Sequence, residues 1–270
     1  MPFEKIVLYV KDIYKRGGIS TISWHFNDPV TDSTAWSKGE RSVNRILTDS
    51  ISKQKYTAYL DKFAALARQF KGRKGEAIPI IFRPFHEHTG NWFWWGKNSC
   101  SAPEFVAIWK YTVDYLRNEK NLHNILYAYS AADFATEQDY LDRYPGDQYV
   151  DVIGFDIYAN NDSTYFKTQL DKRCGLLLDI AKKHNKLPAL TEFGYENMPV
   201  SNWFSETLLP IIKKYKLSYA LTWRNWKDTH FFAPYPGHAS EEDFKAFYKS
   251  PVTLFQKDIK STIYKKSLKN

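Results

Sequence analysis

One segment of the chain brings together residue types that could act on a carbohydrate. An apolar run that begins at Ile78 leads into His86 and Glu87. Three tryptophans follow closely: Trp92, Trp94 and Trp95. A strand without a polar face belongs to a buried parallel sheet, and α/β folds place catalytic groups just past the C-terminal ends of such strands. Glu87 is therefore the first candidate for a catalytic residue, in surroundings that suit the apolar faces of sugar rings.

A second carboxylate has a similar position later in the chain. Glu192 lies at the end of another apolar run. Because parallel strands bring their C-terminal ends to one rim, Glu192 can face Glu87 across a pocket. Two such acids can cleave a glycosidic bond, one as acid/base and the other as nucleophile or base. Other run ends carry further polar or aromatic side chains: Trp24 with His25, Asp156 with Tyr158, and Trp223 with Arg224 and Asn225.

These acids allow other interpretations. Glu192 could be a structural partner of Arg83, because a strand-end carboxylate can satisfy a buried guanidinium. Glu196 lies four residues beyond Glu192 and competes for the nucleophile role. Asp156 could be a buried hydrogen-bonding acid or a residue of the rim.

The sequence does not predict a metal site. A zinc motif of the His-Glu-x-x-His type that begins at His86 would need a histidine at Gly90. The two cysteines, Cys100 and Cys174, fit no metal motif, and they could be either two buried thiols or one disulfide. Acid/base and nucleophile chemistry by two glutamates needs no cofactor.

The elements that must position these residues alternate along the chain. Apolar β-type runs lie at 19–26, 78–85, 124–130, 150–158, 187–193 and 217–224, and segments with helical periodicity separate them. A further helix is predicted near 6–14, before the first run. This pattern predicts an α/β fold of the (β/α)8 TIM-barrel type in which about six of the eight strands are visible and the first two β/α units are absent. An open six-stranded sheet is the alternative.

Length and composition limit the classes of function. The 270 residues contain no linker or low-complexity run, so we predict one domain over residues 1–270. The net charge of +8 is spread along the chain without a basic stripe, which argues against a nucleic-acid partner. No apolar run approaches a membrane span, and the first residues are too charged for a signal peptide.

Five motifs resemble those of glycoside hydrolase family 26, the β-mannanases. The longest is Arg-Pro-Phe-His-Glu-His-Thr-Gly-Asn-Trp-Phe-Trp-Trp-Gly at 83–96, which is similar to the acid/base signature of that family. Similar motifs follow in the family's order at 17–25, 154–158, 190–194 and 222–225. The resemblance covers essentially the whole chain, although the family has about two further β/α units before the first helix.

The resemblance implies a (β/α)8 barrel and a retaining double displacement, with Glu87 as general acid/base and Glu192 as nucleophile. It also implies a set of residues around the substrate: Trp24, His25, Arg83, His86, Trp92, Tyr158, Trp223 and Arg224. In this set Tyr158 would orient Glu192, Trp223 would form the floor under the distorted sugar, and Trp92 would stack on the leaving-group side.

The expected activity is endo-hydrolysis of β-1,4-mannosidic bonds in mannan, galactomannan or glucomannan. Two alternatives stay open: the same mechanism on xylan or mixed-linkage glucan, and a carbohydrate-binding barrel without turnover. We expect a monomer that acts on a polysaccharide or manno-oligosaccharide, with no nucleic-acid, membrane or cofactor partner. From the substrate we expect the full-length protein to be secreted, periplasmic or on the cell surface.

Overall fold

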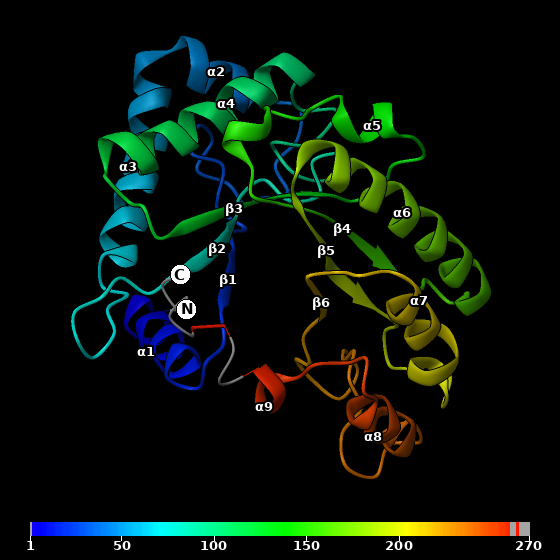
Figure 1. The fold of residues 1–270 in the computed structure, drawn as a ribbon. Helices are drawn as coiled ribbons and strands as arrows, with labels where there is room; N and C mark the ends of the chain where they lie inside the picture. The colour runs from blue at the N-terminus through cyan, green and yellow to red at the C-terminus, as the bar shows by residue number, and fades with distance from the viewer. Residues whose placement is uncertain (1, 260–262, 265–270) are drawn as a thin grey trace. The chain divides into compact units, whose positions relative to one another are not determined.

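The computed structural model of the protein describes residues 2–259 and 263–264, in which parallel strands alternate with helices (Figure 1). These residues divide into two compact units. Unit 1 takes its described residues from Met1–Tyr129, Asp142–Asp151 and Gln256–Asn270, and unit 2 consists of Ser130–Leu141 and Val152–Phe255.

The sheet of unit 1 is parallel. Its strands are β1 (Ser20–Ser23), β2 (Ile80–Arg83) and β3 (Ile125–Ala131), and the last two residues of β3 belong to unit 2. Strand β2 lies between the other two, with Ile80 opposite Ser20 on one side and Ile125 on the other. All four residues of β2 are buried, as the apolar run leading to Glu87 predicts.

The helices of unit 1 precede and follow its strands. They are α1 (Phe3–Lys15), α2 (Ser42–Thr48), α3 (Ser50–Ala67), α4 (Ala102–Asp114), η1 (Tyr115–Glu119), η2 (Asp147–Tyr149) and α9 (Gln256–Ile259). Helix α4 begins at a capping box in which Ser101 and Glu104 each accept a hydrogen bond from the other's backbone N–H. Helix α3 packs on the sheet through Phe63, whose ring stacks on Phe82 of β2 at 4.2 Å between centroids.

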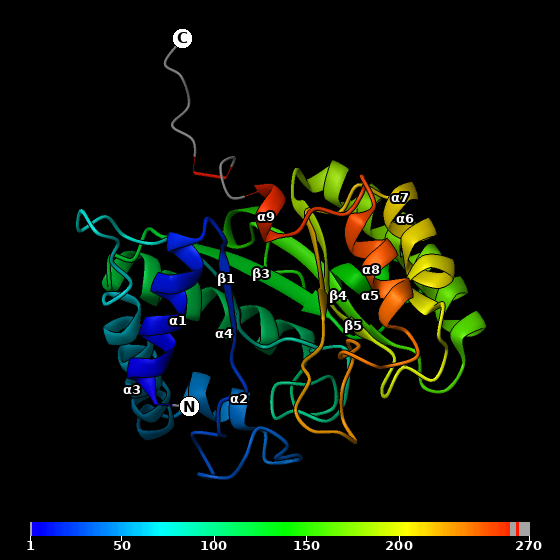
Figure 2. The same cartoon turned by 90° about the horizontal axis from the view of Figure 1, so that it is seen from below.

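Unit 2 repeats the same arrangement. Its strands β4 (Val152–Tyr158), β5 (Leu187–Gly194) and β6 (Tyr219–Thr222) are parallel, with β5 in the middle. Its helices are α5 (Glu137–Leu141), α6 (Ser163–His184), η3 (Phe204–Leu208), α7 (Leu209–Lys214) and α8 (Glu241–Lys249). Figure 2 shows the long helix α6 beside β4 and β5.

The residues at its two ends explain where helix α6 begins and ends. It begins after Asp162, whose carboxylate accepts a hydrogen bond from the backbone N–H of Tyr165 at 2.8 Å. It ends at His184, and the next residue, Asn185, has the left-handed conformation that asparagine tolerates after a helix. Helix α6 therefore connects β4 to β5 as the crossover of a parallel pair.

The six predicted strands and the opening helix are confirmed, but β1, β2, β4 and β6 are shorter than predicted. For β2 the reason is visible in the backbone. Phe85 and Glu87 have φ values of 51° and 55°, which lie outside the extended region. The chain therefore leaves the sheet after Arg83, before the residues that could do chemistry.

Cys100 and Cys174 are both free and buried, so they are two thiols and not one disulfide. Burial raises the pKa of the Cys174 thiol to about 12. In the part of the chain that the structure describes, helices are too short or too polar to cross a membrane.

Candidate active site

Glu87 lies in a tight turn after β2. Its φ of 55° is uncommon for a residue with a side chain, and its carbonyl accepts a hydrogen bond from Gly90 N at 2.9 Å. The side-chain Oε2 accepts a hydrogen bond from Trp92 Nε1 at 2.8 Å. Disfavoured backbone conformations of this kind persist where the surrounding packing holds them, and here the neighbouring Phe85 is completely buried.

The tryptophans after Glu87 divide into two groups. Trp94 and Trp95 are 1% and 0% exposed, and their indole N–H groups donate to the carbonyls of Phe26 and His86. They are core residues. Trp92 is half-buried and is the one that contacts the Glu87 carboxylate.

His86 is a buried, neutral imidazole. Burial lowers its pKa well below the usual value, and the charges of Arg83, His25 and His88 lower that pKa further. Its Nε2 lies 3.1 Å from Nε2 of His25, so one ring donates and the other accepts. Arg83 is buried at the end of β2. The structure therefore brings His25 and His86 together, as the predicted site requires.

Two tryptophans, Trp24 and Trp36, follow β1 in the chain. The ring of Trp24 is half-buried and packs against Phe63 at 5.7 Å and also against Phe82, and its predicted contact with substrate stays a prediction. Trp36 was not predicted, yet it is 56% exposed and stacks on His25 at 5.6 Å between ring centroids. Only its aromatic type could have indicated it, because no β-type run ends near it.

Glu192 lies near the C-terminal end of β5 and is 3% exposed. The phenol of Tyr158, at the end of the neighbouring strand β4, donates a hydrogen bond to Glu192 Oε2 at 2.6 Å. A hydrogen bond of this length between a phenol and a carboxylate fixes the orientation of the carboxylate. This geometry suits a nucleophile.

Asp156 faces Glu192 in the register of β4 and β5, after an irregularity in the pairing. Its carboxylate accepts hydrogen bonds from Thr191 Oγ1 at 2.7 Å and from Ser130 Oγ at 3.1 Å, and it is 5% exposed. Of the two interpretations of Asp156, the structure supports the buried hydrogen-bonding acid.

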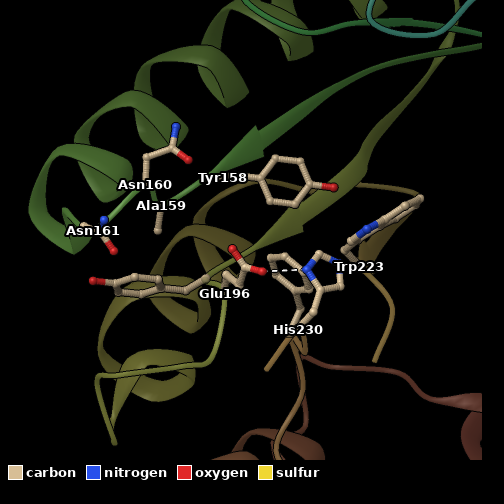
Figure 3. A pocket seen from close by; sticks show the side chains of 9 residues that line it. Tyr158, Ala159, Asn160, Asn161, Glu196, Trp223 and His230 are labelled. Carbon is tan, nitrogen blue, oxygen red and sulfur yellow. Dashed lines mark hydrogen bonds and ion pairs between the residues drawn. The ribbon is translucent and has the colours of Figure 1, made fainter. Parts of the chain in front are cut away.

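Unit 2 contains a pocket of about 390 Å³ beside Tyr158 (Figure 3). It is lined by Tyr158, Ala159, Asn160, Asn161, Tyr195, Glu196, Trp223, His230 and Phe232. The guanidinium of Arg224 lies 5.7 Å from the Trp223 ring and 5.2 Å from that of Trp226. The predicted residues Tyr158 and Trp223 thus share one pocket, and Glu196, the competitor of Glu192, forms part of its wall.

The chain is similar to known proteins over nearly its whole length. Residues 4–258 match the model of the family described as glycosyl hydrolase family 26. A mannan endo-1,4-beta-mannosidase from Bifidobacterium adolescentis is 34% identical over 270 residues, which cover 91% of this chain and 26% of that protein. One from Bacillus subtilis is 29% identical over 225 residues, 78% of this chain and 57% of that protein. The chain thus spans between a quarter and three-fifths of the length of these curated relatives.

Solved structures show the same fold. A GH26 beta-mannanase from Bacteroides ovatus has a TM-score of 0.93 at 39% identity, over 98% of this chain and 78% of that one. A modular endo-beta-1,4-mannanase from Cellulomonas fimi has a TM-score of 0.88 at 33% identity, over 95% of this chain and 59% of that one. Together with the parallel strands of both units, these similarities show an α/β barrel-like fold.

Proposed function

The chain belongs to glycosyl hydrolase family 26, and we propose that it is a retaining endo-β-1,4-mannanase acting on mannan, galactomannan or glucomannan. One observation carries the proposal. Glu87 and Glu192 each follow or end a parallel strand, and each accepts a short hydrogen bond from an aromatic side chain within a chain that matches the family over residues 4–258. The similar relatives are named mannan endo-1,4-beta-mannosidases.

In the proposed mechanism Glu192 attacks the anomeric carbon while Glu87 protonates the departing glycosidic oxygen. A covalent glycosyl-enzyme forms on Glu192, and Glu87, now ionised, removes a proton from the water that hydrolyses it. The two displacements retain the anomeric configuration. Tyr158 holds the Glu192 carboxylate for attack through its 2.6 Å hydrogen bond.

The remaining predicted residues take roles around the sugar chain. Trp223 forms the floor under the sugar at the cleavage point, and Arg224 lies beside it. Trp92 stacks on the leaving-group side while its N–H contacts Glu87. A further group completes the site: His25, Arg83 and His86, in which the neutral imidazole of His86 provides hydrogen bonds without adding charge.

We further propose one catalytic domain with a (β/α)8 barrel of the TIM type, working as a monomer without a cofactor. Because its polymeric substrate lies outside cells, the full-length protein would be secreted, periplasmic or surface-bound.

The direct test measures reducing ends released from galactomannan, with xylan and mixed-linkage glucan in parallel, by the wild type and by Glu192→Ala. Glu206→Ala is the matched control, because Glu206 is an exposed acid of the same unit on η3. We expect release from mannan that is lost in Glu192→Ala and retained in Glu206→Ala. Release only from xylan or glucan would favour the alternative substrates, and binding without any release would favour a non-catalytic barrel.

The roles of Glu87 and Glu192 can be distinguished with substrates whose leaving groups differ. Glu87→Ala should lose most activity on polysaccharide but much less on an aryl mannoside whose phenolate departs without protonation, whereas Glu192→Ala should lose both. Proton NMR can detect which anomer of the product is released first. This anomer should have the configuration of the substrate. Initial appearance of the opposite anomer would contradict a retaining mechanism.

A further inference from the structure

Glu196 and His230 form a contact in the wall of the unit 2 pocket that the mechanism above does not use. Their side chains meet at 2.5 Å between Glu196 Oε1 and His230 Nδ1, drawn as the dashed line in Figure 3. A carboxylate can only accept, so Nδ1 of His230 carries the proton. The pair shares the pocket with Tyr158, which orients Glu192, and with Trp223.

The second carboxylate oxygen of Glu196 is available to a ligand. It makes no hydrogen bond to any residue that the structure describes, and the side chain is 51% exposed. Figure 3 shows it directed toward the side of the pocket where Tyr158 and Asn160 lie. The pocket therefore presents a fixed hydrogen-bond acceptor between an aromatic wall and the amide side chains of Asn160 and Asn161.

The surrounding loops hold the pair in place. His230 closes a short turn in which the backbone N–H of Trp226 donates to its carbonyl at 3.0 Å. Its ring packs against Phe232 at 5.2 Å between centroids. The loop after β5 is joined to this turn by Asn197 N, which donates to the carbonyl of Phe231 at 2.8 Å. A side chain fixed in this way loses little conformational entropy when a ligand binds.

We propose that Glu196 accepts hydrogen bonds from the hydroxyl groups of a hexopyranose unit in this pocket, and that His230 positions its carboxylate. The inference rests on the proposed function and adds a specificity-determining residue to it. Sugar hydroxyls are donors, and a charged acceptor in a polar and aromatic pocket discriminates between substrates more strongly than apolar contact does. His230 acts only through Glu196 and is a positioning residue.

The experiment measures kcat and KM of the wild type, Glu196→Ala and Glu196→Gln on β-1,4-manno-oligosaccharides of increasing length. Loss of a hydrogen bond to a charged acceptor should lower kcat/KM of Glu196→Ala on the order of 10- to 100-fold, mainly through KM. Glu196→Gln, which keeps one acceptor oxygen, should lose less. Glu206→Ala is again the matched control, and thermal melting of each variant checks that it folds.

His230 is tested by a pair of variants. Asn places an N–H near the position of Nδ1, so His230→Asn should keep more affinity than His230→Ala, and neither should add to the loss in a Glu196→Ala background. Calorimetric titration of manno-oligosaccharides into Glu192→Ala, with and without Glu196→Ala, measures binding without turnover and should show the same loss.

The outcomes separate the two proposals. If the wild type cleaves mannan and Glu196→Ala has an unchanged KM, the role of Glu196 is wrong and the proposed function stands. A fall in kcat alone, or equal effects of His230→Asn and His230→Ala, would also overturn the assignment. A wild type that neither cleaves nor binds the oligosaccharides overturns both.

Discussion

The phenol of Tyr158 donates a 2.6 Å hydrogen bond to Oε2 of Glu192, across the paired strands β4 and β5. Strand ends are rigid, so this contact sets the direction of the carboxylate more firmly than a loop could. The pair also belongs to one compact unit of the chain, which makes it a suitable starting point for mutational tests.

Tyr158→Phe should lower kcat about 10- to 100-fold with little change in thermal stability, because it removes one hydrogen bond to a charged group and leaves the ring in place. Steady-state kinetics on mannan checks this. Tyr165→Phe is the control, since Tyr165 is 61% exposed on α6. Equal activity of Tyr158→Phe and the wild type would show that the phenol does not orient the nucleophile.

Trp92→Phe should lower kcat/KM on mannan about 10- to 100-fold, because it removes a side-chain hydrogen bond to the Glu87 carboxylate. The indole N–H donates to Glu87 Oε2 at 2.8 Å and fixes the direction of that side chain. Steady-state kinetics on mannan measures the loss, and thermal melting checks that the variant folds. Wild-type kinetics in Trp92→Phe would show that this contact does not position Glu87.

In His88→Leu, the free energy of unfolding should fall less steeply as the pH is lowered than in the wild type. His88 is completely buried, neither ring nitrogen has a hydrogen-bond partner among the described residues, and burial holds its pKa well below the usual value of about 6.5. Below that value the unfolded chain binds a proton that the folded protein does not, so stability falls with pH until the folded pKa is reached. The slope is about 1.4 kcal/mol per pH unit for each such histidine.

Urea unfolding at pH 7, 6 and 5 measures this slope for the wild type and His88→Leu. His86 contributes a slope of the same sign, so the variant should retain part of the dependence. At pH 7 the substitution should change stability by less than about 1.5 kcal/mol, because Leu fills most of an aromatic site bounded by Phe105 and Tyr129. Identical slopes would show that His88 does not resist protonation in the folded state.

Gly194→Ala should reduce stability by about 1–3 kcal/mol and lower activity with it. A Cβ at Gly194 would overlap the ring of Phe232, so that ring must move, and its packing on Tyr158 at 5.6 Å between centroids would change. Gly175→Ala is the matched control, because its Cβ meets no atom closer than 3.4 Å and alanine favours a helix. Adding Phe232→Leu to Gly194→Ala should restore stability; if it does not, the overlap is not the cause.

Much of the fold could be predicted from local patterns. The apolar runs and the helical periodicity between them indicate all six strands, since each pattern depends on burial of neighbouring residues. The ends of the strands were less predictable. The run around Ile78 continues through Phe85, but the backbone turns after Arg83, because positive φ at Phe85 and Glu87 is imposed by packing of distant side chains.

The sequence by itself determined the family, the parallel βα pattern and the position of Glu87 and Glu192 at strand ends, because these depend on residue type and spacing along the chain. Only the tertiary structure decided which side chains meet: Trp92 with Glu87, Tyr158 with Glu192, and Glu196 with His230. It also placed the half-buried Trp24 ring against Phe63. Side-chain partners depend on loop paths and rotamers fixed by contacts between distant segments, and no local pattern contains that information.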